Sequence, residues 1–497
     1  MPAHAPGAPR VMIAQAAPHP RTMAEVYRRS TRPVERECEC ALECISGTLP
    51  DALQGVLFRN GPGRQEIFGV PYGHPFDGDG MITRFEFRDG QVHYRNRYVQ
   101  TRELREETRA GRSLYRSFGT NLPGGLSRNA LRLRFKNAAN TSVVLHGGKL
   151  LALWEGGWPH ALDPKTLDTQ SRYNFGGNLR NRRIDRFLSP ELPFSAHPKR
   201  CPLNGELVNF GMALGVKPRL MLYRISAAGE MDSPVSLELP ELSFVHDFVL
   251  TERHLVFFLP AVAFDVPKAL AGLSTPVDSL RALERPTKIL VLDRKSFRRV
   301  CELETEPGFV FHFANGYEEP DGGFVVDGYR MPELPNGDAI RDVVEGRASE
   351  YPRATLIRTR FRPGESEVQS EELYPLPGEL PHIDPRYLTQ RHRVIFAALS
   401  PLARPDPFLT ALGRFDLEAR TSTVRDFGQD LVGEPVFVPR SASAPEGDGF
   451  LLVLCHAADR DRAELHILNA ETLDEEACFA LPHSIPPGFH GTFVAES

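Results

Sequence analysis

Four histidines stand in short apolar or aromatic contexts at widely separated points of the sequence. They are His197 in Phe194–Pro198, His246 in Phe244–Phe248, His312 in Phe311–Asn315 and His490 in Gly488–Thr492. A single histidine on an apolar strand is usually a hydrogen-bonded core residue. Four neutral imidazoles that meet at one point, however, form a good site for a divalent transition metal such as iron. Such a site requires a fold in which strands from distant parts of the chain converge.

Four similar segments predict that kind of fold. Each has a short apolar strand, an Asp or Asn turn followed by Thr or Ser, and a second strand; the turn residues are Asp163, Asp293, Asp416 and Asn469. The first two gaps, of 130 and 123 residues, are close to twice a period of about 60 residues, as expected for a degenerate blade repeat with insertions. The natural candidate is an all-β propeller, whose strands converge on a central axis.

The remaining segments fit this reading. Apolar runs predict strands at 255–259, 288–292, 323–326, 394–398 and 450–454. Short helices are expected at 22–29, 102–109, 277–283 and 338–344, between the strands rather than alternating with them. Residues 1–20 are expected to form a disordered tail. Because no Pro/Ser-rich linker divides the interior, residues 21–497 are expected to form one domain.

Composition and missing motifs argue against several classes of protein. The 497 residues include 59 Lys and Arg against 64 Asp and Glu, for a net charge of -5, so no nucleic-acid partner is expected. The seven cysteines are odd in number and scattered, which favours reduced thiols and a cytoplasmic protein. Val11–Ala14 is too short for the core of a signal peptide, and no run of about 18 apolar residues could span a bilayer. Phosphate-loop, dinucleotide, zincin and serine-hydrolase motifs are absent from the sequence.

Taken together, these residues and their motifs resemble the carotenoid cleavage oxygenases, a family that includes apocarotenoid oxygenases, stilbene cleavage dioxygenases and the retinoid isomerase. The resemblance runs in order from Leu57–Gly63 and Phe76–Met81 to Phe489–Gly491. It implies a seven-bladed propeller with a small helical and loop cap over the metal-bearing axis. The family's four iron-binding histidines fall on the four histidines named above.

The resemblance also places three glutamates behind the metal, at Glu155, Glu379 and Glu434. They would support His246, His312 and His490 respectively and leave His197 without a carboxylate. A carboxylate on the second ring nitrogen of a ligating histidine fixes its tautomer and raises its basicity. Without the surrounding motifs, each glutamate would be read as a solvated or salt-bridged residue.

The implied activity is that of a non-haem dioxygenase. Fe(II) and O2 would cleave a conjugated C=C bond of a carotenoid or apocarotenoid to two carbonyl products, retinal or a related apocarotenal. Thr141 matches a residue beside the open iron position, where it would limit how O2 binds; the alternative is a hydroxyl that only hydrogen-bonds within a strand. Aromatic residues near the ligands suit a polyene tunnel, and core packing would also produce them; they are Trp154, Phe244, Phe311, Phe437 and Phe489.

The main alternative is the stilbene-cleaving branch, which gives hydroxybenzaldehydes and holds a phenol hydroxyl with a tyrosine and a lysine. Tyr98 and Lys136 could be that pair. Residues 135–141 and 151–155 look more like apocarotenoid oxygenases. Isomerohydrolase activity on a retinyl ester and a non-enzymatic binding propeller are weaker alternatives.

Access to a membrane-dissolved polyene suggests peripheral membrane contact. Residues 122–135 mix apolar side chains with three arginines, and residues 257–273 contain a second apolar run. Either segment could instead pack within the cap. No obligate protein partner is evident. Four other histidines are expected to lie outside the ligand set, namely His74, His160, His382 and His483.

Overall fold

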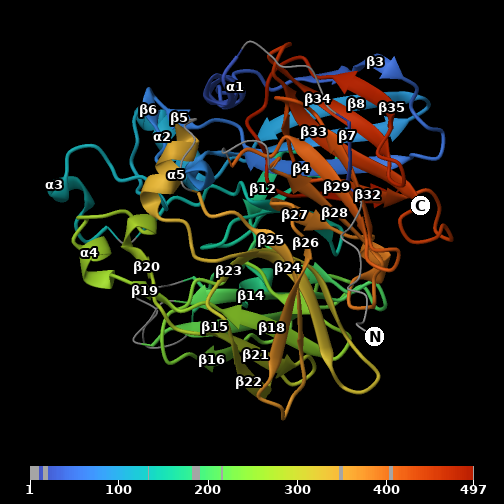
Figure 1. Ribbon diagram of the computed structural model, residues 1–497. Coiled ribbons are helices and arrows are strands. Elements are labelled where there is room, and N and C mark those ends of the chain that lie inside the picture. Colours follow the sequence, from blue (N-terminus) through green and yellow to red (C-terminus); the bar gives the residue numbers. More distant parts are fainter. Residues whose placement is uncertain are drawn as a thin grey trace.

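The computed structural model describes residues 11–14, 21–132, 134–181, 191–213, 217–345, 351–401 and 407–495. Within these residues the strands form seven large sheets arranged as the blades of a β-propeller, which confirms the predicted fold class (Figure 1). Two further sheets are two-stranded hairpins.

The blades are antiparallel except at the outer edge of the sixth, where β1 (Val11–Ala14) pairs parallel, and one strand of each blade lies nearest the axis. The first blade, from outside to axis, is β2 (Glu39–Ala41), β8 (Gln91–Tyr98), β7 (Gly80–Arg88), β4 (Gly55–Pro62) and β36 (Gly491–Ala495). From the axis outward, the second is β9 (Ser142–His146), β10 (Lys149–Leu153), β11 (His160–Leu162) and β12 (Thr169–Arg172), and the third is β13 (Lys199–Arg200), β14 (Leu207–Ala213), β15 (Arg219–Ile225) and β16 (Val235–Glu238).

The next three blades follow the same order from the axis outward. The fourth is β17 (Val249–Leu250), β18 (His254–Leu259), β21 (Thr287–Asp293) and β22 (Arg299–Thr305). The fifth is β23 (Phe309–Glu318), β24 (Phe324–Met331), β25 (Thr355–Phe361) and β26 (Val368–Tyr374). The sixth is β27 (Gly378–His382), β28 (Val394–Leu399), β29 (Ala411–Asp416) and β30 (Thr421–Asp426).

The ring closes by exchanging strands between the two ends of the chain. In the seventh blade, β31 (Leu431–Val432) and β32 (Val436–Pro439) pair with β33 (Gly449–Ala457), followed by β34 (Arg462–Asn469), β35 (Glu475–Ala480) and β3 (Glu43–Gly47). Thus β3 completes the last blade, while β36 pairs antiparallel with β4 and completes the first. Two strand pairings therefore hold the ring shut.

The four predicted hairpins are confirmed, and all four join the third strand of a blade to the fourth. In each, an Asp or Asn side chain accepts backbone N–H groups two or three residues ahead; Asp163 Oδ1, for example, accepts from Lys165 and Thr166 at 2.8 Å each. A residue in the left-handed region follows four residues later, at Leu167, Phe297, Arg420 and Leu473. The Asp or Asn side chain provides the local bonds that such a turn needs.

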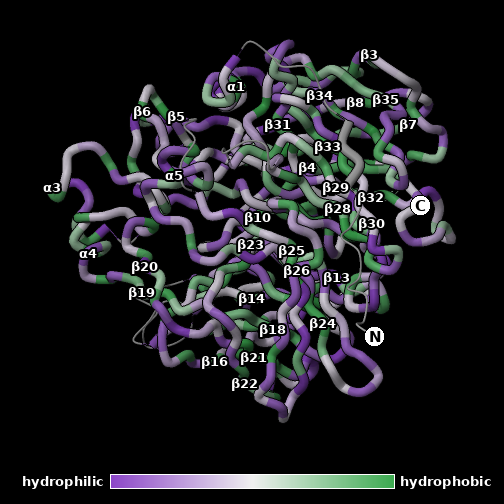
Figure 2. The backbone as a smooth tube through the Cα atoms, viewed as in Figure 1, coloured by the Kyte–Doolittle hydropathy of each residue, from purple (hydrophilic) through white to green (hydrophobic). Residues whose placement is uncertain are grey.

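The core consists of apolar clusters between successive blades. In β18, Leu255 and Phe257 pack toward the third blade, whereas Val256 and Phe258 pack toward the fifth. Because side chains alternate across a strand, a blade that is buried on both faces needs apolar residues at consecutive positions. Figure 2 shows hydrophobic residues interspersed along the blade strands. This accounts for the short continuous apolar runs in the sequence.

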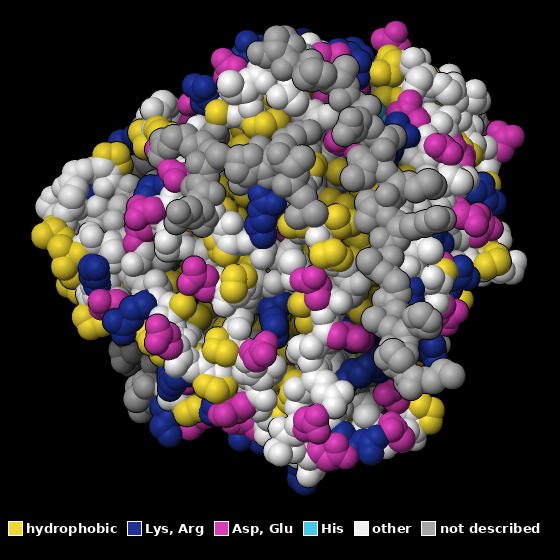
Figure 3. Space-filling model, viewed as in Figure 1, with side chains coloured by type: hydrophobic (Ala, Val, Ile, Leu, Met, Phe, Trp, Pro, Cys, Tyr) yellow, Lys and Arg dark blue, Asp and Glu magenta, His cyan; other side chains and the backbone are white. Residues whose placement is uncertain are grey.

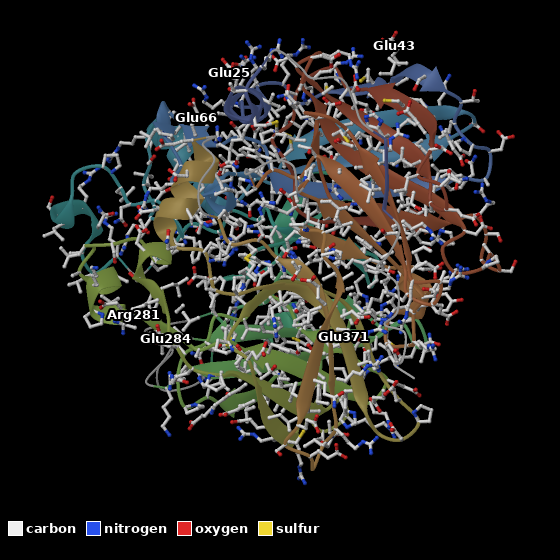
Figure 4. All side chains as sticks on the ribbon, viewed as in Figure 1. Glu25, Glu43, Glu66, Arg281, Glu284 and Glu371 are labelled. Atoms are coloured by element: carbon white, nitrogen blue, oxygen red, sulfur yellow. The ribbon has the colours of Figure 1, made fainter. Side chains whose placement is uncertain are left out.

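Helices and two hairpins gather on one side of the propeller and form the cap (Figure 1). The cap contains β5 (Glu66–Ile67), β6 (Val70–Pro71), α2 (Arg102–Ala110), α3 (Leu126–Asn129), β19 (Val262–Phe264), α4 (Val266–Leu270), β20 (Leu280–Ala282) and α5 (Gly337–Val344). Glu66 of β5 and Arg281 of β20, labelled in Figure 4, mark the two hairpins. No helix among the described residues has the length and apolar character to cross a membrane.

Three of the four expected helices are confirmed, as α1 (Met23–Ser30), α2 and α5. The helix expected at 277–283 is wrong. There a single 3-10 turn, Val277–Ser279, leads into β20, which pairs with β19. Further 3-10 turns lie at Pro75–Asp77, Phe175–Gly177 and Pro385–Tyr387.

The N-terminal segment carries one strand. Within the segment expected to be a disordered tail, Val11–Ala14 form β1, which pairs parallel with β30. The other residues of 1–20 lie outside the described residues.

Candidate metal centre

The four predicted histidines come together at the propeller axis, and each lies within or just before the axial strand of a different blade. His197 and His246 lie shortly before β13 and β17, His490 directly precedes β36, and His312 lies within β23. One ring nitrogen of each lies within 4.8 Å of those of the other three. The register of β23 shifts between Val310 and Phe313, and such a bulge re-aims the His312 side chain toward the axis.

The ring nitrogens that face the centre fit a divalent metal. His312 Nε2 is buried and has no hydrogen-bond partner among the described residues. The Nε2 atoms of His197 and His246 lie 2.9 Å apart. Two neighbouring ligands of one octahedral metal, each about 2.1 Å from it, are about 3 Å apart. All four donors are nitrogens, a set that suits iron among other transition metals.

Two of the predicted carboxylates lie as expected behind their histidines. Glu379 Oε2 is 2.6 Å from His312 Nδ1, and Glu434 Oε1 is 2.8 Å from His490 Nδ1. Because Nδ1 is taken up in this way, Nε2 of each ring is left to face the centre.

Glu155 lies differently from the expectation. Its Oε1 is 3.4 Å from both His246 Nδ1 and His197 Nε2, so it faces two histidines rather than His246 alone. Burial and the charge of Asp247 raise the pKa of Glu155 to about 8. His197, for which no carboxylate is expected, therefore has one close by.

At three of the four histidines the environment favours the neutral imidazole. Burial lowers the pKa of His197 and His246 well below the ordinary value of 6.5, and the neighbouring histidines lower it further. Burial likewise lowers the pKa of His490. At His312 burial acts in the same direction, but the charge and hydrogen bond of Glu379 outweigh it, and the pKa is raised. Neutral rings are the form that binds a metal.

Two buried residues that the sequence analysis did not single out hold these groups in place. Arg59 of β4 donates to Glu434 Oε2 at 2.8 Å and to the Phe489 carbonyl at 3.2 Å. Although burial opposes ionisation of Glu434, His490 and Arg59 lower its pKa to about 2. The quoted motif Leu57–Gly63 contains Arg59, so the signal was present in the sequence.

Asp247 is the second such residue. It follows His246 directly, accepts the Phe313 N–H at 3.0 Å and pairs with Lys199 Nζ at 2.7 Å. Since Phe313 follows His312, this carboxylate couples the strands that carry two of the histidines. Its position next to His246 was the available signal.

Thr141 contacts the centre through its backbone. Its carbonyl accepts the His490 N–H at 3.2 Å, while the Asn60 N–H donates to the His490 carbonyl at 2.9 Å. The Thr141 hydroxyl donates to Asn140 Oδ1 at 3.1 Å. This contact favours the hydrogen-bonding alternative for the hydroxyl, and a role in O2 binding stays a prediction.

An aromatic wall leads from the histidines toward the cap. Phe311 meets the His246 ring edge-on at 5.2 Å between centroids, and Phe76 lies 5.2 Å from Phe489 and 6.4 Å from Phe311. Farther out follow contacts of 4.6 to 6.0 Å that join Phe311, Phe309, Phe244 and Phe118 in that order.

The wall includes three of the five predicted aromatic residues, Phe244, Phe311 and Phe489. The structure does not place Phe437 in the wall. This side chain is 1% exposed and stacks on Phe396 with 5.4 Å between ring centroids. It packs between the sixth and seventh blades, because β32 directs it into the core. Trp154 is half-buried next to Glu155, and its ring lies against Gly156 and Gly157.

A cavity of about 220 Å³ lies on the other side of the histidines. Phe244 and Phe311, which precede His246 and His312, belong to the aromatic wall, whereas the residues that directly follow these two histidines line this cavity. The cavity lining includes Pro198, Lys199, Asp247, Phe313 and His382. The centre therefore separates an aromatic side under the cap from a more polar side.

Tyr98 and Lys136, the two residues of the phenol-binding alternative, have different partners among the described residues. The Tyr98 hydroxyl lies 2.8 Å from the Gly63 carbonyl and 2.9 Å from the Val34 carbonyl. Lys136 Nζ is buried in ion pairs with Asp79 at 2.7 Å and Glu107 at 2.8 Å.

The other four histidines lie outside the set of four. His74 accepts the Phe76 N–H, and His160 is buried in β11. His382 lines the cavity described above, and His483 lies between Tyr94 and Cys38.

Comparison with known proteins agrees with this arrangement. The model of the retinal pigment epithelial membrane protein family matches residues 31–495. Apocarotenoid-15,15'-oxygenase of Synechocystis is 33% identical over 92% of this chain and 94% of that protein, and resveratrol cleavage oxygenase 1 of Aspergillus fumigatus is 30% identical over 90% and 91%. The structure of cobalt-substituted Synechocystis apocarotenoid oxygenase aligns with a TM-score of 0.89 at 32% identity, over 95% of this chain and 99% of that one. The chain therefore belongs to the retinal pigment epithelial membrane protein family, the carotenoid cleavage oxygenases.

Proposed function

We propose that this protein is an Fe(II)-dependent dioxygenase that cleaves a conjugated C=C bond of an apocarotenoid or carotenoid to two carbonyl products. The observation that carries the proposal is the pairing of a four-nitrogen centre, backed by Glu379 and Glu434, with an aromatic wall beside it. The 33% identity to apocarotenoid-15,15'-oxygenase supports this substrate class. Retinal or a related apocarotenal is the expected product.

The four histidines would hold Fe(II), which supplies the activation of O2 when bound. The protein's own part is positional. Glu379 and Glu434 keep two ligand rings in one orientation, and the aromatic side chains bind the polyene and exclude water from the reacting bond. Aromatic faces also stabilise positive charge that develops on a polyene. No protein nucleophile is needed in this scheme.

The proposal is tested by aerobic incubation of the Fe(II)-loaded protein with apocarotenals, a full-length carotenoid and hydroxystilbenes, followed by mass identification of products. We expect a short apocarotenal such as retinal, formed with consumption of O2. Hydroxybenzaldehydes alone would move the assignment to the stilbene branch, to which the relative named for resveratrol cleavage belongs by its name. An isomerised product without O2 consumption would contradict oxygenase activity.

We also propose that the protein is cytoplasmic and contacts membranes peripherally through the cap. Large apolar side chains are exposed on two neighbouring cap segments: Leu126 at 51% and Leu131 at 81%, then Val266 at 42%, Leu270 at 36% and Leu273 at 62%. The Leu131 N–H donates to the Leu270 carbonyl, so the segments are adjacent. Figure 3 shows hydrophobic side chains beside Lys and Arg along this edge. The seven free cysteines support a reducing compartment.

The membrane proposal predicts the behaviour of a double variant. Leu131→Asp with Leu273→Asp should lower partitioning onto phosphatidylcholine vesicles at least about tenfold in a sedimentation assay, because each leucine loses its apolar contact with lipid. Leu203→Asp is the matched control, since Leu203 is 59% exposed outside the cap. Equal loss of vesicle binding in the double variant and in Leu203→Asp, or no loss of vesicle binding in the double variant, would refute the assigned surface.

We further propose that residues 21–497 act as one folding unit. The pairing of β36 with β4 and of β35 with β3 supports this, because both ends of the chain are needed to complete the ring.

A further inference from the structure

A second group of metal-ligating side chains lies in the seventh blade, away from the axial strands. Glu464 and His466 are two residues apart on β34 and therefore point to the same face of the sheet. Cys478 of β35 is directly opposite His466 in the strand register. The three residues are 0%, 6% and 2% exposed, so solvent does not provide their hydrogen bonds.

The donor atoms form a nearly equilateral triangle. His466 Nε2 lies 3.8 Å from Cys478 Sγ and 3.9 Å from Glu464 Oε2, and Cys478 Sγ lies 4.0 Å from Glu464 Oε2. The centre of such a triangle is about 2.25 Å from each corner, close to the zinc distances of about 2.3 Å for sulfur and about 2.0–2.2 Å for nitrogen and oxygen.

Neighbouring groups orient the donors as in a metal site. Glu475 Oε2 is 2.8 Å from His466 Nδ1, which leaves Nε2 to face the thiol and the carboxylate. Arg460 donates to both oxygens of Glu464, at 2.6 Å to Oε1 and 2.7 Å to Oε2, and Arg462 donates to Oε1 at 3.0 Å. Because each carboxylate oxygen has about two lone-pair positions, Oε2 keeps one for a cation. The thiol carries one proton, so it cannot donate to both of its neighbours, and its two contacts are long.

We propose that Glu464, His466 and Cys478 bind a divalent zinc-class cation, in a site separate from the four-histidine centre. A thiolate, an imidazole and a carboxylate form a donor set that zinc prefers, whereas the axial set contains nitrogen alone. On binding, the cation replaces the thiol proton, which passes to solvent. The ion would tie β34 to β35 in the blade that β3 closes.

Cobalt provides a readout that separates the two centres, because only a thiolate ligand gives the near-ultraviolet sulfur-to-cobalt charge-transfer band. Titration of the folded, iron-loaded protein with Co(II) should produce this band at about one equivalent per chain. Elemental analysis of protein purified with zinc present should give about one zinc besides the iron. Cys478→Ser should lose both the band and the zinc, while its retained iron shows that the ring is folded.

Two control variants test the location. Cys201→Ser removes a buried thiol from a cluster between the third and fourth blades, and Cys38→Ser removes a thiol that also lies 3.8 Å from a histidine, His483. Both should keep the band and the zinc. Loss of the band in Cys38→Ser with retention in Cys478→Ser would overturn the proposal, as would a parent protein with no band and no zinc.

A measurement on the parent protein decides the matter if Cys478→Ser does not fold. X-ray absorption at the zinc edge should show one sulfur at about 2.3 Å with nitrogen and oxygen ligands at about 2.0–2.2 Å. A first coordination sphere without sulfur would overturn the proposal.

Discussion

His312→Ala is expected to reduce bound iron from about one ion per chain to less than about a tenth, and to lower kcat/KM for polyene cleavage at least about 100-fold. Changes to groups that merely orient a ligand cost about 10- to 100-fold in metal affinity, so loss of a ligand should cost more. His312 also carries the unpartnered buried Nε2 and the short contact to Glu379, so its removal leaves that carboxylate unpaired. Iron analysis and product kinetics measure both effects.

The matched variants are His93→Ala and Glu379→Gln. His93 is a half-buried residue of β8, outside the centre, and its replacement should leave iron content unchanged. Glu379→Gln keeps an acceptor oxygen but loses the charge, so an intermediate loss of iron affinity is expected. Full iron and activity in His312→Ala would show that the metal binds elsewhere.

Lys136→Ala is expected to destabilise the fold by about 3–5 kcal/mol in urea unfolding, because it leaves buried carboxylates without their counter-charge. The Lys136 side chain is 1% exposed and donates to Asp79, Glu107 and the Tyr72 hydroxyl. Although burial opposes the charged form, Asp79 and the other partners raise the pKa of Lys136, so the lysine is charged at neutral pH. In the variant, Asp79 would keep its ion pair with Arg64 at 2.8 Å. Among the described residues no ion pair joins Arg64 to Glu107, so Arg64 does not replace the lysine there.

Lys217→Ala serves as the control, since that lysine is 67% exposed and pairs with a half-exposed glutamate; a change of less than about 0.5 kcal/mol is expected. Stability equal to that of the parent in Lys136→Ala, together with a raised KM for hydroxystilbenes only, would instead support the phenol-binding role.

The sequence predicts local structure well where one turn motif repeats. The turn residues Asp163 and Asn469 mark hairpins because their side chains satisfy turn N–H groups within three residues. The strand at 255–259 was predictable because both of its faces pack against neighbouring blades, which requires the continuous apolar run seen in the sequence. The helix expected at 277–283 failed because tertiary pairing of β20 with β19 overrides a short helical pattern.

Long-range packing decided the parts that the sequence could not predict. Phe437 and Phe489 both stand near ligand motifs, yet only the path of the backbone turns one into the blade core and the other toward the centre. The partners of Glu155 depend on distances between three different blades. Arg59 and Lys136 were recognisable as motif residues, but their buried ion pairs join positions far apart in the chain.

Closure of the ring by β36 sets the order of events during synthesis of the protein. Roughly 430 residues separate β4 from β36, which corresponds to about 20–90 s of translation at about 5–20 residues per second. During this interval the nascent chain exposes an unpaired edge of β4 that is open to association with other strands. His490 directly precedes β36, so the set of four ligands is completed together with the strand that covers this edge. Loading of the proposed iron at the complete centre would therefore follow translation, and chaperones that protect the open edge would act before the metal does.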